Sequence, residues 1–184
     1  MILSDGEIRE EMDKGTIQIS GCDELYIGPS SIDLHLDSKS MVMNDRTRPI
    51  KLFNENAMLF HQYDGWSEIM IRPNAFYLLS TIEKIKLSDG IVGFVQGRSS
   101  IARAGIKVQD AGFCDAGFEG TITLEVNNFT SCPIIVEKGT RICQLIFARM
   151  GKDAIVPYWK KKDQKYQGQS GPTLSRIERD HGKD

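Results

Sequence analysis

The sequence predicts an all-β domain, a barrel or a sandwich, that follows one short N-terminal helix. Much of the chain divides into short segments in which apolar and polar residues alternate, as in Ile32–Leu36 and Thr121–Val126. This alternation places successive side chains on opposite faces of a strand. Turn signals separate the segments, for example at Gly28–Ser31 and Ser88–Gly90. Short strands at regular spacing with such turns are typical of β-barrels and β-sandwiches.

The helix is predicted for residues 4–14. Ser4 can cap its N-terminus, and Glu7 stands three residues later, where it completes a capping box. Leu3 and Ile8 occupy the positions of a hydrophobic staple. We expect this helix to support the fold rather than to take part in chemistry.

Nine further segments are expected to be strands. Each is an alternating or apolar run that ends at a turn signal: 16–20, 32–36, 69–71, 76–82, 85–87, 91–96, 121–126, 133–137 and 141–147. Asn44–Pro49 has the composition of a hairpin tip. Residues 99–104 could form one helical turn.

Length and charge restrict the class of protein. A chain of 184 residues fits one domain with short arms, and a net charge of -2 gives no general attraction to nucleic acid or anionic membrane. No apolar run reaches transmembrane length, and no signal-peptide pattern is present. The four cysteines are scattered, which is not typical of a disulfide framework. We therefore expect a cytoplasmic protein, in the host cytoplasm if a virus encodes it.

One stretch, FVQGRSSIAR, is rich in hydrogen-bond donors. Gly97 allows the backbone to approach a ligand closely. Four donors follow it without an intervening acidic residue: Arg98, Ser99, Ser100 and Arg103. Such a set suits an anion with several oxygens, such as a triphosphate. Taken alone, the stretch fits an ordinary turn with solvated side chains equally well.

Two carboxylates follow this stretch, Asp115 and Glu125. On the predicted strand, Glu125 shares a face with Thr123, whereas the opposite face is apolar and consists of Ile122, Leu124 and Val126. A glutamate on a strand often only faces water. Combined with the phosphate donors, however, the two carboxylates indicate an enzyme that handles nucleotides.

Together these motifs resemble the dCTP deaminases of the trimeric dUTPase superfamily. The resemblance runs through Gly97–Arg103, Asp115–Gly120 and Thr123–Glu125 in the family's order. Pro29–Leu34 resembles the first motif of the superfamily, and MILSD is how many members begin. Near the end, KYQGQ followed by GPT resembles the C-terminal segment of the family. The resemblance therefore covers nearly the whole chain.

The resemblance implies a distorted, jelly-roll-like β-barrel of the dUTPase (β-clip) type that forms a homotrimer with shared active sites. The substrates would be dCTP or dUTP, with dTTP as an inhibitor. Mg²⁺ would be held mainly by the triphosphate and water, with Asp33 as a further contact. Glu125 would take a proton from the water that attacks C4 and pass it to the leaving ammonia. Nucleotide-binding positions would be Arg98, Ser99, Ser100, Ile101, Ala102, Arg103, Asp115, Thr123, Leu124, Gln144, Tyr158, Lys165, Tyr166 and Gln169.

Within this set the resemblance gives separate roles. The donors after Gly97 would bind phosphates, Asp115 would hold the 3′-hydroxyl of the deoxyribose, and the backbone at Thr123 and Leu124 would contact the base. Residues 158–176 would be an arm that closes over the nucleotide, within a single domain of residues 1–176. Composition alone favours a frayed terminus for this polar segment. Residues 177–184 are expected to be a disordered tail.

The histidines bear on how water would be activated. Zinc-dependent cytosine deaminases need His-x-Glu and Pro-Cys-x-x-Cys. Glu does not stand two positions after His35, His61 or His181, and no Cys-x-x-Cys pair occurs. We therefore expect deamination that does not depend on zinc.

The product is open at this point, because the family includes enzymes that release dUTP and enzymes that release dUMP. Gln109–Asp115 resembles the short loop of dUMP-forming members, and Gln144 matches a residue of that group. Enzymes that stop at dUTP typically carry a basic pair where Gly112–Phe113 stands. Asp110 is unexpected beside the base. The sequence also leaves open a plain dUTPase, which generally lacks an equivalent of Glu125, and a non-catalytic relative that only binds nucleotide.

Overall fold

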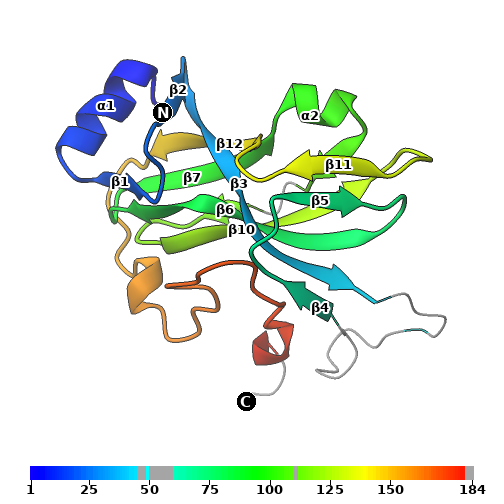
Figure 1. The fold of residues 1–184 in the computed structure, drawn as a ribbon. Helices are drawn as coiled ribbons and strands as arrows, with labels where there is room; N and C mark the ends of the chain where they lie inside the picture. The colour runs from blue at the N-terminus through cyan, green and yellow to red at the C-terminus, as the bar shows by residue number, and fades with distance from the viewer. Residues whose placement is uncertain (45–48, 50–59, 110–111, 181–184) are drawn as a thin grey trace.

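The computed structural model describes residues 1–44, 49, 60–109 and 112–180, and strands are its main regular elements (Figure 1). In chain order its elements are α1 (Asp5–Asp13), β1 (Ile17–Ser20), β2 (Tyr26–Gly28), β3 (Ser31–Met43), β4 (Phe60–Tyr63), β5 (Glu68–Ile71), β6 (Phe76–Leu87), β7 (Ile91–Gly97), α2 (Ser99–Arg103), β8 (Ile106–Val108), β9 (Phe113–Cys114), β10 (Glu119–Asn128), β11 (Ile134–Glu137), β12 (Arg141–Arg149), η2 (Tyr158–Lys160) and η3 (Ile177–Asp180). The predicted all-β class is confirmed.

One large curled sheet contains most strands, in the order β8-β10-β6-β3-β12-β7-β9. In addition, β1 pairs with β6, whereas β2 and β4 pair with β3. β5 and β11 form a separate two-stranded sheet. The long strand β3 joins β8, β10 and β6 on one side of the sheet to β12, β7 and β9 on the other. Its first residues pair with β12, and its last residues pair with β6 and β4. A register shift between Leu36 and Ser40 marks the change of partner, and such irregularities bend a sheet.

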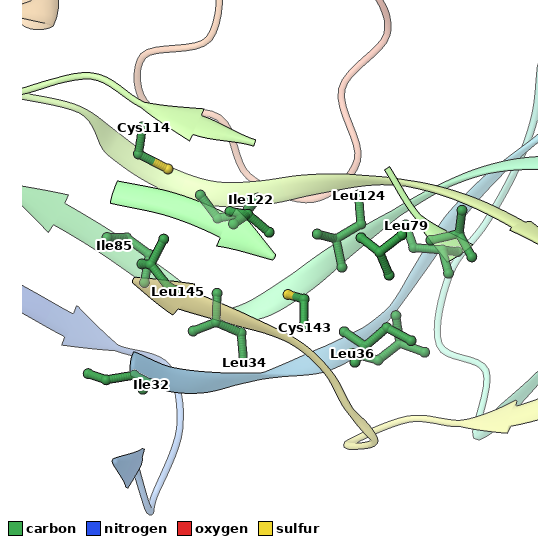
Figure 2. Packing of buried hydrophobic residues seen from close by; sticks show 14 of the residues in the cluster. Ile32, Leu34, Leu36, Leu79, Ile85, Cys114, Ile122, Leu124, Cys143 and Leu145 are labelled. Carbon is green, nitrogen blue, oxygen red and sulfur yellow. The ribbon is translucent and has the colours of Figure 1, made fainter. Parts of the chain in front are cut away.

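The core lies inside this curl (Figure 2). The predicted alternation holds on β3 and β10, where every second side chain is buried. The buried residues that meet include Ile32, Leu34 and Leu36 from β3, Leu79 and Ile85 from β6, Ile122 and Leu124 from β10, and Leu145 from β12. Burial raises the pKa of the Cys114 thiol, which lies in the same core, to about 12.

The N-terminal helix forms as predicted. Ser4 is its N-cap, and the capping box with Glu7 is present, with a distance of 2.8 Å from Ser4 N to Glu7 Oε2. Leu3 and Ile8 are buried in the core. Glu11 anchors the helix, since its buried carboxylate accepts hydrogen bonds from Thr16, Lys14 and Arg149.

Two local expectations differ from the structure. The segments predicted as separate strands at 76–82 and 85–87 form one strand, β6. The polar Glu83 interrupts the apolar pattern, but it is buried, and its carboxylate accepts the backbone N–H of His35 at 2.9 Å and contacts His35 Nδ1 at 2.5 Å. Residues 177–180 form η3 instead of the expected disorder, with Asp180 bound to Lys165.

Some expectations fall outside the described residues. Most of the proposed hairpin tip at Asn44–Pro49 lies there, as do Asp110 and the end of the tail at 181–184. Among the helices that the structure describes, none has the length and apolar character needed to cross a membrane.

Candidate active site

A cleft of about 720 Å³ opens over the polar face of β10. Thr123 and Glu125 lie on that face, as predicted, while Leu124 points into the core and is 1% exposed. The turn from Asp115 to Phe118 forms one side of the cleft, and the arm of residues 158–176 covers another. β10 thus presents the predicted base inside a concave site rather than on an open wet surface.

Glu125 is half-buried beside apolar side chains. Its neighbour across the β10–β6 pair is Leu78, which shares the cleft with Met43, Phe60 and Phe76. We call these four residues the apolar wall. Burial raises the pKa of Glu125, and a hydrogen bond to its own backbone offsets only part of this effect. A carboxylate with a raised pKa can accept and return a proton near neutral pH.

The arm is attached to β10 through its backbone. Thr121 N donates to Gln169 O at 3.0 Å, Gly171 N donates to Thr121 Oγ1 at 2.9 Å, and Thr173 N donates to Thr123 Oγ1 at 3.1 Å. Thr121 and Thr123 are two residues apart on one face of β10, and so are the arm residues Gly171 and Thr173 that donate to them. The spacing of the threonine hydroxyls therefore matches the spacing of N–H groups along an extended arm. The arm therefore lies over the same face that carries Glu125.

Tyr158 organises the arm. Its hydroxyl accepts the backbone N–H groups of Lys165 at 3.2 Å and Tyr166 at 3.0 Å, and its ring packs against Phe118 with centroids 6.0 Å apart. Gly117 has a φ of +82°, and a Cβ there would lie 2.7 Å from Trp159 Cδ1. The glycine thus allows the start of the arm to lie directly on the turn after Asp115.

The stretch that was predicted to bind phosphate lies elsewhere. Arg98 to Arg103 do not line the cleft, and Figure 1 places α2 on the opposite side of the molecule from the arm. Arg98 Nε instead contacts Asp33 Oδ2 at 3.2 Å, and Arg141 NH1 contacts the same oxygen at 3.3 Å. Gln144 pairs with Asp33 across β3 and β12 and accepts a 3.4 Å hydrogen bond from Ser31. Arg98, Arg141 and Gln144 thus form a second cluster around Asp33.

Comparison with known proteins assigns the chain. Residues 2–150 match the family described as dCTP deaminase-like. A relative from Sulfurihydrogenibium sp. (strain YO3AOP1), named dCTP deaminase, dUMP-forming, is 41% identical over 179 residues, which are 96% of this chain and 97% of that protein. The chain belongs to the dCTP deaminase-like family.

A further relative supports the same family, and solved structures share the fold. A Mycobacterium avium protein named dCTP deaminase, dUMP-forming is 40% identical over 183 residues, or 96% of this chain and 95% of its own. The 2'-deoxycytidine 5'-triphosphate deaminase of Agrobacterium tumefaciens superimposes with a TM-score of 0.63 at 26% identity, over 82% of this chain but 48% of that longer chain. A phage 80alpha dUTPase shares the fold at 14% identity, with a TM-score of 0.52 over 76% of this chain and 94% of its own.

For this family member, the predicted site residues separate into two groups. Asp115, Thr123, Glu125, Tyr158, Lys165, Tyr166 and Gln169 come together in the cleft. Arg98, Asp33 and Gln144 come together in the second cluster, next to α2, whereas Leu124 is buried in the core and is not among the residues that line the cleft. Sequence reasoning missed Arg141, which also stacks over Tyr26 with its Cζ 3.9 Å from the ring centroid.

The apolar wall was also missed. Phe76 and Leu78 stood in a predicted strand, but alternation alone does not tell which strand lies beside Glu125. Met43 and Phe60 lie outside the segments that were predicted as strands. Only the pairing of strands brings these side chains close to Glu125, the predicted general base.

Asp33 does not fit a role as a direct Mg²⁺ ligand. Its carboxylate already contacts two guanidinium groups, those of Arg98 and Arg141, and lies in a half-buried position. A cation at that oxygen would have to displace one of two cations. Within the described ranges, His, Cys, Asp and Glu side chains do not gather in threes as a metal site. Binding of Mg²⁺ through the triphosphate stays a prediction.

Proposed function

We propose that this protein deaminates dCTP at C4 and releases dUMP, with Glu125 as the general base. The observation that carries the proposal is the position of Glu125: half-buried against the apolar wall, with a raised pKa, on the floor of a cleft that the arm covers. The names of the relatives from Sulfurihydrogenibium sp. and M. avium support both the substrate and the product.

Each cleft residue has a task in this proposal. Glu125 removes a proton from the water that attacks C4, and the same carboxylic acid then protonates the leaving amine. One side chain can do both only if its pKa is near the working pH, which the apolar wall favours. Asp115 lies on the same cleft as a partner for the 3′-hydroxyl, and the arm excludes water when it is closed. General acid–base catalysis of this kind contributes on the order of 10²- to 10⁴-fold.

The side-chain amide of Gln169 is placed to hold the cytosine ring of the substrate. Its Nε2 donates to Thr121 O at 2.7 Å, while its Oε1 is buried and has no partner among the described residues. Gln169 lines the cleft, so this oxygen is suited to accept a hydrogen bond from a ligand N–H. The exocyclic amine of cytosine is such a donor.

We further propose that the active site is shared between copies of the chain, as in a homotrimer. Supporting this is the separation of the base from the phosphate donors within one chain. A site that joined Glu125 to Arg98, Ser99, Ser100 and Arg103 would need α2 from a neighbouring copy. The exposed T-shaped pair of Phe94 and Phe113, with centroids 5.2 Å apart, is suited to burial between subunits.

Formation of dUMP needs water attack at the α-phosphorus and departure of diphosphate. The guanidinium groups of Arg98 and Arg103 would take the developing negative charge, with the triphosphate entering as its Mg²⁺ complex. Independence from zinc, inhibition by dTTP and a cytoplasmic location remain predictions. The alternative, a one-step deaminase that releases dUTP, also remains a prediction. A relative from Natronomonas pharaonis, 34% identical over 192 residues, is named dCTP deaminase without the term dUMP-forming.

The experiment is to incubate the pure protein with dCTP and Mg²⁺ and to measure ammonia, diphosphate, dUTP and dUMP separately. We expect ammonia and diphosphate to appear together, with dUMP as product and little free dUTP. Accumulation of dUTP without diphosphate would identify a one-step deaminase. In a parallel incubation with dUTP, release of diphosphate, combined with no ammonia from dCTP, would identify a plain dUTPase.

Glu125→Gln tests the base separately. The change keeps the size of the side chain and removes the proton acceptor, so ammonia release should fall by about 10²-fold or more. Nucleotide binding, measured by calorimetry, should stay within about tenfold, since the amide can still occupy the same space. Retention of more than roughly a tenth of the deamination rate would remove Glu125 from the mechanism.

A further inference from the structure

A second cavity, of about 650 Å³, lies behind the active-site cleft, on the opposite face of β3, β4 and β6. Directly opposed residues in antiparallel strands point to the same face. Ser40 lies opposite Tyr63 and Leu79, and Val42 lies opposite His61 and Tyr77. We call this cavity the rear groove and define it by its floor of Ser40, Val42 and Tyr77. The apolar wall projects from the other face of the same strands.

Three polar atoms in residues that line the rear groove have no hydrogen-bond partner among the described residues. Ser40 Oγ, Asn44 Oδ1 and Trp66 Nε1 are buried, and none has a hydrogen-bond partner within the described part of the chain. Ser40 is 0% exposed, on a strand face that also carries Ile32, Leu34 and Leu36 of the core. By contrast, the hydroxyl of Tyr77 is satisfied, because it donates to Met70 O at 3.0 Å and accepts from Arg72 N at 3.1 Å. Buried polar groups are nearly always paired, so the three atoms are suited to a partner from outside the chain.

The chemistry of these atoms restricts the partner. Trp66 Nε1 only donates, so it requires an acceptor such as a carbonyl oxygen. Asn44 Oδ1 accepts and requires an N–H donor, while Ser40 can do either. The rings of Trp66, Tyr77, Tyr63 and His61 lie around them, and such rings suit a flat ligand. We propose that the rear groove is a second ligand site, which binds a planar heterocycle that offers both a carbonyl oxygen and a ring N–H, as a pyrimidine base does.

The site is placed to influence the deaminase cleft. Met43 lines both cavities, and Tyr77 stands on β6 between Phe76 and Leu78, which face Glu125's side of the sheet. A ligand in the rear groove would therefore contact the same strands that carry the apolar wall on their other face. Because packed strands move little independently, occupancy of one cavity is expected to change the affinity of the other.

Tryptophan fluorescence gives a direct test. The chain has two tryptophans, so in a Trp159→Phe background Trp66 is the remaining one, and it lines the rear groove. The full-length protein is titrated with uracil and, separately, with 1,3-dimethyluracil, which keeps both carbonyls and lacks both ring N–H groups. We expect saturable quenching by uracil and binding of the dimethyl compound that is weaker by about tenfold, the scale of one lost hydrogen bond.

Ser40→Ala, with Ser38→Ala as its control, separates binding from folding. Ser38 lies two residues earlier on the same buried face and does not line the groove. Ser40→Ala should weaken uracil binding by about fivefold to tenfold without lowering the melting temperature, because its hydroxyl has no described partner to lose. Ser38→Ala should leave uracil binding unchanged.

Three results would overturn the proposal. These are the absence of saturable quenching up to the solubility limit of uracil, equal binding of the dimethyl compound, and uracil binding by the Ser40→Ala variant that equals that of its parent protein. The last result would place the response outside the rear groove. The rear groove is independent of the proposed deaminase activity, so its failure leaves that activity untouched.

Discussion

Gly117→Ala should detach the arm from the turn after Asp115 without unfolding the barrel. The φ of +82° at this glycine costs an alanine about 1–2 kcal/mol wherever the arm lies. A Cβ would also lie 2.7 Å from Trp159 Cδ1 and 2.9 Å from Pro157 Cβ, and contacts this short cannot persist. The start of the arm must therefore move away.

The size of the effect follows from the contacts that such a movement breaks. Tyr158 N donates to Ala116 O at 2.8 Å, and Trp159 Nε1 donates to Asp89 Oδ1 at 3.0 Å. Losing two hydrogen bonds at about 1 kcal/mol each lowers the ratio of closed to open arm by roughly thirtyfold. We expect kcat/KM for dCTP to fall by up to about that factor.

Gly139→Ala is the matched control. Gly139 has nearly the same backbone conformation, with a φ of +81°, but no atom lies within 4 Å of an added Cβ. Both variants should lose about 1–2 kcal/mol of unfolding free energy in urea, whereas only Gly117→Ala should lose activity. If their kcat/KM values agree within about threefold, the close approach at Gly117 does not hold the arm in its working position.

Three further predictions concern the arm and the helix. Truncation before Lys165 should strongly weaken triphosphate binding by calorimetry, while the melting temperature and the number of subunits in the proposed trimer stay as in the full chain; full activity would exclude the arm from the site. Asp180→Asn should lower KM for dCTP by up to about fivefold, because it removes the carboxylate that now holds the Lys165 ammonium, and a raised KM would contradict this. Glu11→Gln should cost about 2 kcal/mol in urea unfolding at pH 7, since three donors hold the pKa of the buried carboxylate at about 2. Its folded pKa is lowered, so the difference between Glu11→Gln and the native protein should vanish as pH falls from about 5 towards 2, and a constant difference would refute the assignment.

Local rules predicted much of the fold from the sequence. The capping box at Ser4 and Glu7 and the alternating burial of β3 and β10 depend on neighbours close in the chain. Pairing was not predictable in this way, because hydrogen bonds between strands join residues far apart in sequence. The continuity of β6 is an example, since it depends on Glu83 meeting His35, 48 residues away.

For the candidate site, the sequence by itself determined which chemical groups exist and their order along the chain. Glu125, Asp115 and the donors after Gly97 are recognisable because their type and spacing match a family. The tertiary structure alone decided their environment. It buried Glu125 beside Leu78, which raises the pKa of the carboxylate, and it placed Arg98 against Asp33 on the other side of the molecule. A pKa and a shared site depend on distances through space, which strand pairing sets and sequence spacing does not.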